Sequence, residues 1–266
     1  MKLRKIIRKK PSQSALDFAN KAKQRFHKEK TTTDRRFHAE NKGPFLNPRF
    51  AEYPFNTICR FIDAGYDNGK GIVASGVVIS DFTILTAGHN LVHPDLEYLP
   101  SYSIVPGFDS SLNMQVYKKW DYELHPKWKA QDEFDDFYDL ALVHTNKRLP
   151  EFIFPTPPSE VSDEDDFTMA FGYRAKKPER QSWGFGARIE EVASLLGYNV
   201  PTRRGQSGGA VFVLVGEDLP LIATHNGGAG VAEDEFVNKL NKGVQYTDEI
   251  YEWIVSKARF ATENIA

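Results

Sequence analysis

The chain has 266 residues, of which 41% are hydrophobic and 26% charged, a composition typical of a soluble globular protein with one large or two modest domains. No stretch approaches the roughly 20 apolar residues that span a bilayer, which excludes an integral membrane protein with transmembrane helices. The single cysteine, Cys59, excludes a disulfide-stapled scaffold, and no Cys/His cluster has the spacing of a zinc finger. We therefore expect no metal, no cofactor and no transmembrane anchor.

Charge is distributed unevenly along the chain. Residues 1–43 carry 14 Lys and Arg against four acidic residues, a net charge of +10, whereas residues 44–266 carry 20 basic and 32 acidic side chains. We expect residues 1–43 to form a basic N-terminal arm, either as a solvated tail or as a pro-segment that contacts the acidic domain through charge. Binding of nucleic acid or an anionic membrane surface is the alternative, but no motif supports it, and no specific nucleic-acid partner is expected.

The start of the arm lacks the pattern of an export signal. Residues 1–10 are basic, but residues 11–14 are Pro, Ser, Gln and Ser, and a charged stretch follows. The apolar core of a signal peptide is therefore missing. This favours a cytoplasmic location over secretion, and the alternative is a leader removed before this numbering begins.

Two amphipathic helices are predicted, one near each end of the chain. In the arm, apolar residues at positions 16, 19, 22 and 26 follow Ser14 at helical spacing. Near the C-terminus, Thr247 precedes a helix whose apolar residues at positions 250, 253, 254 and 258 share one face.

Short β-rich runs, broken by Gly, Asp and Asn, fill the chain between these helices. The predicted strands are residues 57–62, 71–79, 83–86, 103–105, 140–144, 168–172, 210–215, 219–224 and 243–246. Many short strands at regular spacing indicate an all-β sandwich or barrel protein. The acidic, Pro-rich residues 150–166 are interpreted as a solvated linker between two β units, because Glu160 and the acids at 163–166 lack the spacing of a calcium loop.

The strongest local motif is Gly-Gln-Ser-Gly-Gly at residues 205–209, followed by an apolar strand. Glycines around Ser207 leave its hydroxyl and backbone accessible to a substrate carbonyl. The backbone N–H groups of Gly205 and Ser207 would then converge on a developing oxyanion. The same pattern occurs in the α/β-hydrolase elbow, but there a helix follows the serine, and Asp and then His come later in the chain. Here a β-run follows, so we disfavour that interpretation.

Two further motifs place candidate partners for this serine. Residues 84–88 form an apolar strand with a small-residue end, directly before His89, and Asp139 directly precedes the apolar run 140–143. Either motif alone is unspecific, since a histidine near a strand end is usually an ordinary surface or core residue. Together with Ser207 they give the order His, Asp, Ser, which is the chain order of the chymotrypsin-type triad.

With these motifs, the sequence resembles the trypsin-like serine peptidases, and within them the bacterial glutamyl endopeptidases, over about residues 56–256. The matching segments are residues 75–79 with 85–89, 139–142 and 205–212, with further landmarks at 170–173 and 223–228. The resemblance implies an all-β fold of two six-stranded antiparallel β-barrels, with the active site in the cleft between them. It places an N-terminal barrel in residues 44–150 and a C-terminal barrel with the C-terminal helix in residues 151–266.

The resemblance also implies the activity of a serine endopeptidase, with a protein or peptide as substrate and an acyl-enzyme intermediate. Ser207 is then the nucleophile, and His89 takes and returns its proton. Asp139 fixes the imidazole tautomer and stabilises the imidazolium. Residues 132, 135 and 136 are also Asp and compete for the orienting role, but only Asp139 stands immediately before the apolar strand.

Substrate preference rests on a finer part of the resemblance. Glutamyl endopeptidases have a histidine just before the substrate-binding glycine pair, here His225, and a threonine five residues before the nucleophile, here Thr202. An imidazole and a hydroxyl suit a carboxylate, whereas selection of Lys or Arg needs an acid, and Pro201 stands where trypsin-like pockets have one. The sequence therefore predicts cleavage after Glu or Asp. A preference for small or apolar residues, with His225 as an ordinary strand histidine, is the alternative.

The remaining expected pocket residues are Asn226, Gly227 and Gly228. Asn226 departs from the aromatic residue often found there in glutamyl endopeptidases, and the arginines at 203 and 204 add positive potential.

Activation is expected to differ from that of trypsin, where an Asp before the nucleophile pairs with a new N-terminus. Gln206 occupies that position and cannot form the ion pair. The oxyanion hole is then preformed or governed otherwise, with the basic arm as the candidate for control. A catalytically silent trypsin-like binding module is the alternative function, and the presence of all three triad residues argues against it.

Overall fold

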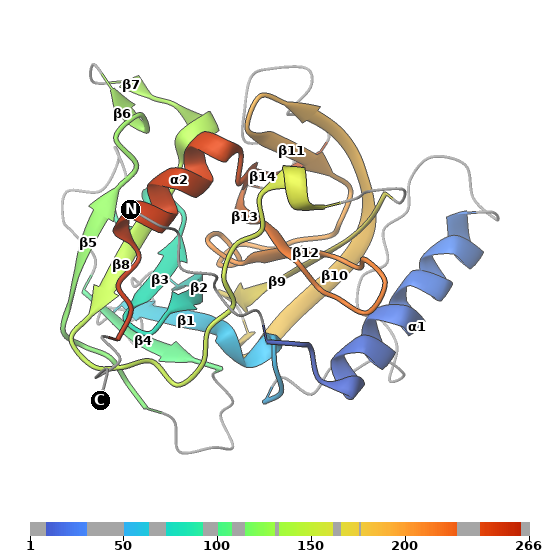
Figure 1. Cartoon of the computed structure of the whole chain (residues 1–266), viewed down its shortest axis with the longest axis horizontal. Coiled ribbons are helices and arrows are strands. Elements are labelled where there is room, and N and C mark those ends of the chain that lie inside the picture. The colour runs from blue at the N-terminus through green and yellow to red at the C-terminus, as the bar shows by residue number, and fades with distance from the viewer. Residues whose placement is uncertain are drawn as a thin grey trace.

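The structure is a computed structural model that describes residues 9–30, 51–63, 73–92, 101–107, 115–130, 133–161, 166–175, 177–227 and 240–261. Two curved β-sheets lie side by side, with α1 beside the second sheet and α2 across the first (Figure 1). Neither α1 nor α2 nor any other described helix has the length and apolar character of a membrane-spanning helix.

The N-terminal sheet has six antiparallel strands in the order β4-β1-β2-β3-β8-β5. They are β1 (Ile58–Asp63), β2 (Val73–Ser80), β3 (Thr83–Thr86), β4 (Tyr102–Pro106), β5 (Trp120–Leu124) and β8 (Ala141–Thr145). A bridge between Ile104 and Tyr117 joins β4 to the segment that leads into β5, so the sheet curls back on itself. A short ribbon of β6 (Lys129–Ala130) and β7 (Glu133–Phe134) extends from it.

The C-terminal sheet is a closed barrel in the order β10-β11-β14-β13-β12-β9. Its strands are β9 (Phe167–Arg174), β10 (Lys177–Val192), β11 (Leu195–Tyr198), β12 (Ala210–Val213), β13 (Leu221–Gly227) and β14 (Asn241–Gln245). The predicted all-β fold of two antiparallel six-stranded units is thus confirmed, with one closed barrel and one half-barrel.

Strands β5, β6, β7, β10 and β11 were not among the predicted strands. In β10, charged residues and two glycines interrupt the apolar alternation that marks a strand. The glycines have a packing reason, because a Cβ on Gly184 would lie 2.7 Å from the Pro201 carbonyl oxygen and one on Gly186 2.4 Å from Asn199 Oδ1. Close approach of another chain segment therefore imposes glycine inside a long strand.

Helix α2 (Asp248–Lys257) confirms the predicted C-terminal helix and packs against the N-terminal sheet. Thr247 stands at its N-cap position, as predicted, but makes no side-chain capping hydrogen bond. Beyond the helix, the Arg259 carbonyl accepts from Phe82 N at 3.1 Å, so the C-terminal segment is attached to the turn between β2 and β3 of the first sheet.

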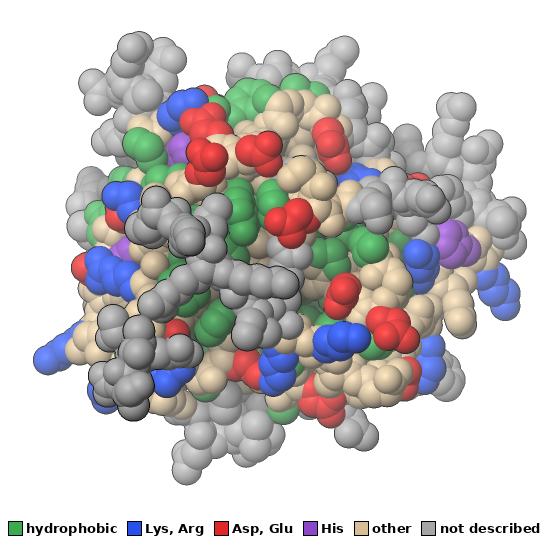
Figure 2. Space-filling view, viewed as in Figure 1, with side chains coloured by type: hydrophobic (Ala, Val, Ile, Leu, Met, Phe, Trp, Pro, Cys, Tyr) green, Lys and Arg blue, Asp and Glu red, His purple; other side chains and the backbone are tan. Residues whose placement is uncertain are grey.

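The N-terminal helix α1 (Gln13–Lys30) confirms the amphipathic helix predicted in the arm, and its buried face contradicts the expectation of a solvated tail for these residues. Its buried side chains are Ala15, Leu16, Phe18, Ala19, Ala22 and Phe26, which belong to the same core cluster as the C-terminal barrel. Lys21 and Lys28 are exposed on the outer face of α1, whereas Lys23 and Arg25 are half-buried at its flanks. Figure 2 shows Lys and Arg side chains at the surface of this part of the molecule. One ion pair, between Lys9 and Glu151, also joins this segment to the domain, but the helix itself is attached by the packing of its apolar side chains. The rest of the predicted arm, residues 1–8 and 31–43, lies outside the described residues.

The segment between the two β units is also more buried than the predicted solvated linker. Ile153 and Phe154 are in the core, Ile153 N donates to the Val78 carbonyl in β2 at 2.9 Å, and Thr156 N donates to Leu221 O in β13 at 2.9 Å. Glu160 is exposed, as expected, and residues 162–165 lie outside the described part. The connection thus bonds to both barrels because its apolar residues fill the space between them.

Candidate active site

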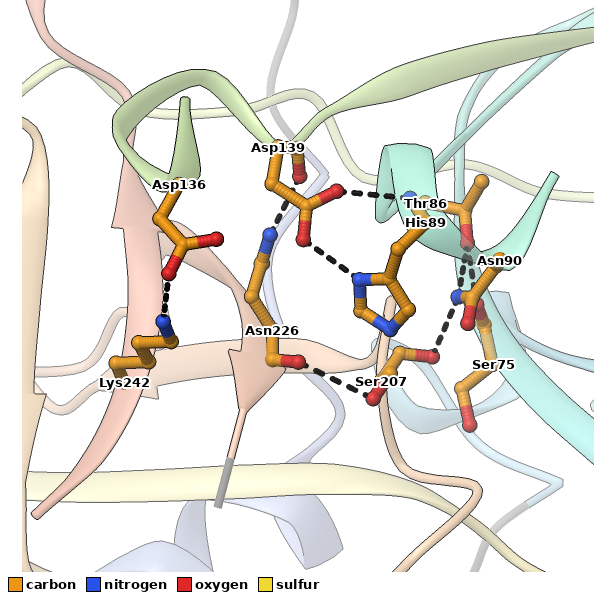
Figure 3. A network of polar contacts seen from close by, with 9 residues as sticks. All are labelled: Ser75, Thr86, His89, Asn90, Asp136, Asp139, Ser207, Asn226 and Lys242. Atoms are coloured by element: carbon orange, nitrogen blue, oxygen red, sulfur yellow. Dashed lines mark hydrogen bonds and ion pairs between the residues drawn. The ribbon is translucent and has the colours of Figure 1, made fainter. Parts of the chain in front are cut away.

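The three predicted triad residues come together where the two barrels meet. His89 lies in a short 3-10 turn, η3 (Gly88–Asn90), which directly follows β3, and Asp139 directly follows the turn η4 (Asp136–Tyr138) and precedes β8. Strands β3 and β8 are paired, so their ends present the two residues side by side. Ser207 comes from the C-terminal barrel, in the turn before β12. Figure 3 shows the His89 imidazole between the Asp139 carboxylate and the Ser207 side chain.

Asp139 holds the histidine through two hydrogen bonds. Its Oδ2 lies 2.6 Å from His89 Nδ1, and its Oδ1 accepts from the backbone N–H of His89 at 2.8 Å. The carboxylate side chain is only 7% exposed, whereas the imidazole is 27% exposed on the side away from it. This arrangement fixes both the tautomer and the orientation of the ring, because Nδ1 carries the proton toward the carboxylate.

The two side chains shift each other's protonation. Burial alone would lower the pKa of His89, but the charge of Asp139 and the hydrogen bond to it outweigh this effect and raise the pKa above 6.5. Burial alone would raise the pKa of Asp139, but the charge of His89 and hydrogen bonds from His89 and Asn226 lower the pKa below its ordinary value. Each partner therefore stabilises the charged form of the other.

The structure distinguishes Asp139 from the competing acids predicted nearby. Asp135 caps η4, accepting from Phe137 N at 2.9 Å, and Asp136 pairs with Lys242. Asp132 lies outside the described residues. Of the described candidates, only Asp139 contacts the His89 ring through a hydrogen bond.

Side chains of the N-terminal sheet hold the nucleophile turn in place. The carbonyl oxygen of Ser207 accepts from Ser75 N and from Asn90 Nδ2, both at 2.9 Å. Asn90 Nδ2 also lies 3.0 Å from Thr86 Oγ1, which donates to the Ser75 carbonyl at 2.7 Å. The motifs at residues 75–79 and 85–89 contain Ser75 and Thr86, but the sequence alone predicts no role for these two residues or for Asn90. Figure 3 shows that they form one network with the predicted triad.

Ser75 connects the same turn to strand β9. Its Oγ donates to the Gly205 carbonyl at 2.9 Å and accepts from Tyr173 N at 2.8 Å. Gly208 is required at its position, because its φ is +85° and a Cβ there would lie 2.0 Å from the Ser75 carbonyl oxygen. The turn thus fits against the first barrel without space for a side chain beside Ser207.

The peptide groups that contain the N–H groups of Gly205 and Ser207 have fixed orientations. The carbonyl of Arg204 accepts from Ala175 N at 2.8 Å, and the carbonyl of Gln206 accepts from Gly209 N at 2.9 Å. In a trans peptide the N–H points opposite to the carbonyl, so the N–H groups of Gly205 and Ser207 point away from these partners. The buried Gln206 side chain accepts from Arg203 N at 2.6 Å and holds the turn closed.

Strand β13 supplies the predicted pocket residues on the other side of Ser207. The Ser207 hydroxyl donates to the Asn226 carbonyl at 3.2 Å, and Asn226 Nδ2 donates to the Asp139 carbonyl. Gly227 follows at the end of the strand, whereas Gly228 lies outside the described residues. Asn226 therefore touches both the nucleophile and the segment that carries Asp139.

His225 is bonded to the nucleophile turn through its backbone, since its carbonyl accepts from Gly208 N at 2.7 Å. Its ring is buried, with Nδ1 2.6 Å from the Tyr198 hydroxyl, and burial lowers the pKa of His225 to about 4. The imidazole is therefore neutral at neutral pH. Thr202 is half-buried in the segment before the turn, and in the described part of the chain no hydrogen bond joins its side chain to His225.

The described residues also contain no cluster of three or more His, Cys, Asp or Glu that would hold a metal ion.

No protein-family model and no curated protein matches the chain. Among solved structures it is similar to a Glu endopeptidase determined in complex with MPD, with a TM-score of 0.60 and 20% identity, covering 78% of this chain and 93% of that one. It is also similar to a thermostable serine protease, AL20, from an extremophilic microorganism, with a TM-score of 0.54 and 16% identity, covering 76% of this chain and 98% of that one. The chain thus has the chymotrypsin-like fold found in trypsin-like serine peptidases, as predicted from its motifs.

Proposed function

We propose that the protein is a serine endopeptidase that cleaves peptide bonds through an acyl-enzyme intermediate. The observation that carries this proposal is the placement of Ser207 beside a histidine whose Nδ1 is held 2.6 Å from a buried carboxylate. A serine hydroxyl needs an adjacent base to react at neutral pH, and an oriented imidazole supplies one.

In the proposed mechanism, the Ser207 hydroxyl turns from the Asn226 carbonyl toward Nε2 of His89 and attacks the substrate carbonyl. His89 takes the hydroxyl proton and returns it to the leaving amine, and Asp139 stabilises the intervening imidazolium. When the hydroxyl turns, the Asn226 carbonyl is left to accept a backbone N–H of the substrate. A water molecule then hydrolyses the acyl-enzyme by the same route.

The developing oxyanion is assigned to the N–H groups of Gly205 and Ser207. Both peptide groups are already oriented by the bonds that their carbonyl partners make to Ala175 and Gly209. Donors that are fixed before reaction need no reorganisation in the transition state. The site is therefore proposed to be preformed, without the ion pair that orders this region in trypsin.

For specificity we propose cleavage after Glu or Asp, with Thr202 and His225 as determinants beside Gly227 and Gly228. The Tyr198 hydroxyl donates to the Lys242 carbonyl at 3.2 Å and lies 2.6 Å from Nδ1 of His225, so it holds the imidazole in place beside the proposed pocket. A second candidate is a preference for small or apolar residues. It is favoured by the lowered pKa of His225, because a neutral buried imidazole attracts a carboxylate less than a charged one does.

A fluorophosphonate probe and a peptide library test these proposals together. The wild type should be labelled on Ser207 and should cleave after Glu more than Asp, whereas Ser207→Ala or His89→Ala should lower turnover about a million-fold. Asp139→Asn should cost about ten-thousand-fold through the wrong imidazole tautomer. Residual activity of a few per cent in Ser207→Ala would refute the mechanism, and efficient cleavage after Arg would refute the acidic preference.

A further inference from the structure

An ion pair outside the predicted triad joins the two barrels beside Asp139. Lys242 lies on β14 of the C-terminal barrel, and its Nζ pairs with the carboxylate of Asp136 in η4 of the N-terminal sheet. The Lys242 side chain is only 11% exposed, whereas that of Asp136 is 53% exposed. Figure 3 shows the pair on the far side of Asn226 from His89.

The stem of Lys242 is seated against the backbone of the proposed substrate-binding strand. A Cβ on Gly227 would lie 2.9 Å from Cε and 3.3 Å from Cγ of Lys242, so a side chain at position 227 would displace the lysine. Glycine at that position thus makes room for the Lys242 stem, and its ammonium group reaches across to the other barrel.

Two more hydrogen bonds attach the same segment of the N-terminal sheet to the C-terminal barrel. Ser194 Oγ donates to the Phe137 carbonyl, and Asn226 Nδ2 donates to the Asp139 carbonyl. Together with the ion pair at Asp136, the segment 136–139 is bonded to three different parts of the second barrel. The position of the carboxylate that orients His89 thus depends on contacts made by the neighbouring barrel.

The titratable groups that act on His89 lie in four parts of the chain. Asp139 touches the ring, whereas Asp136 in η4 and Lys242 in β14 act on it through their charge, and His225 in β13 is the fourth group. After burial and Asp139, the negative charge of Asp136 raises the pKa of His89 and the positive charge of Lys242 lowers it. The two effects oppose each other, and His225 is neutral at neutral pH.

We propose that Asp136 and Lys242 are positioning residues of this site: their ion pair clasps the two barrels beside Asp139, and each partner offsets the charge that the other alone would place near His89. Its catalytic part rests on the proposed peptidase function, but the effect on His89 does not. With both partners present, their opposite charges act against each other at His89, and the bond between the barrels keeps the Asp139 carboxylate beside the imidazole.

The test compares Lys242→Met, which keeps the stem, with Asp136→Asn and with the double variant. In a Ser207→Ala background, the His89 imidazole is titrated by NMR, its signal assigned by its absence in a His89→Gln variant. Lys242→Met should raise the pKa of His89 because Asp136 is left uncompensated, and Asp136→Asn should lower it because Lys242 is left alone. The double variant should return to the wild-type value.

Lys257→Met is the matched control, since it removes the same charge from an exposed pair with Glu123. It should leave the His89 titration unchanged. If Asp136→Asn, which alters a half-exposed side chain and should fold, leaves the titration unchanged, the charge balance is refuted, as it is if both single variants shift it in the same direction.

The clasp is tested separately with active Ser207. All three variants should lose roughly tenfold to a hundredfold in the pH-independent kcat/KM, because a small displacement of a catalytic group is costly. The acid limb should move to higher pH in Lys242→Met and to lower pH in Asp136→Asn. An unchanged plateau in the double variant would overturn the clasp. A wild type without cleavage or probe labelling would overturn the proposed function instead, and the NMR titration would still decide the charge balance.

Discussion

Removal of one aromatic side chain from α1 should destabilise the whole two-barrel fold, because α1 shares its hydrophobic core. Phe18 is 5% exposed, and its ring centroid lies 4.7 Å from that of Trp183, 5.7 Å from Phe55 and 6.3 Å from Phe171. Phe18→Ala removes all three ring contacts and leaves a cavity between the helix and the barrel. Truncations of this kind lower the free energy of unfolding by about 3–5 kcal/mol.

Urea unfolding followed by tryptophan fluorescence measures this effect, and Trp183 reports directly on the contact. With an m-value of about 3 kcal/mol/M for a chain of this size, the midpoint should fall by roughly 1–2 M without a change in slope. Gln24→Ala, on the exposed face of the same helix, is the control and should shift stability by no more than about 0.5 kcal/mol. Equal midpoints for the two variants would refute the conclusion that α1 belongs to the cooperative unit.

Two further predictions concern the site and its surroundings. Gly208→Ala places a Cβ 2.0 Å from the Ser75 carbonyl oxygen and 2.2 Å from Thr86 Oγ1 at a φ of +85°. The free energy of unfolding should therefore fall by more than the about 1–3 kcal/mol of backbone strain alone. Urea unfolding measures this loss, and an unchanged midpoint would contradict the described geometry. Burial lowers the pKa of His125 to about 4, so the unfolded state binds its proton at higher pH and the free energy of unfolding should fall as pH drops from about 6.5 to about 4. In His125→Phe this part of the pH dependence should disappear. Urea unfolding of both proteins across that pH range is the test, and the same pH dependence in the variant as in the wild type would show that His125 is not its source.

The β-architecture could be predicted because it depends on local patterns, and the strands that escaped prediction lacked such a pattern. The wholly buried β3 and β8 are short apolar runs and were recognised. The surface strand β5 has no side chain that is fully buried, so its sequence carries no clear alternation. In β10 the glycines at 184 and 186 are needed because residues 199–201 of a different segment pack closely against them, and such contacts cannot be predicted from the local sequence.

The same distinction applies to the site. Ser207, His89 and Asp139 each stand in a short local motif, and their order along the chain predicts a triad. The structure brings the three side chains together, and their catalytic role stays a prediction. The contacts between barrels could not, because the bond from Asn90 to the Ser207 carbonyl joins residues 117 positions apart and that from Lys242 to Asp136 joins residues 106 apart. Only the folded arrangement of the two barrels makes these residues neighbours.

The N-terminal segment illustrates how two signals in one sequence can be weighed differently. Its net charge of +10 favoured an arm attached by charge, while its apolar spacing predicted an amphipathic helix. Attraction between exposed charges is screened within about 8 Å at physiological salt, whereas a buried Phe side chain contributes about 1.5–3 kcal/mol whatever the salt concentration. Because Phe18 and Phe26 are both buried, burial of apolar surface stabilises the attachment of α1 more than attraction between exposed charges does. The charge therefore describes the outer face of α1, and the apolar face determines where the helix is attached: behind β9 and β10, the strands that support the turn carrying Ser207.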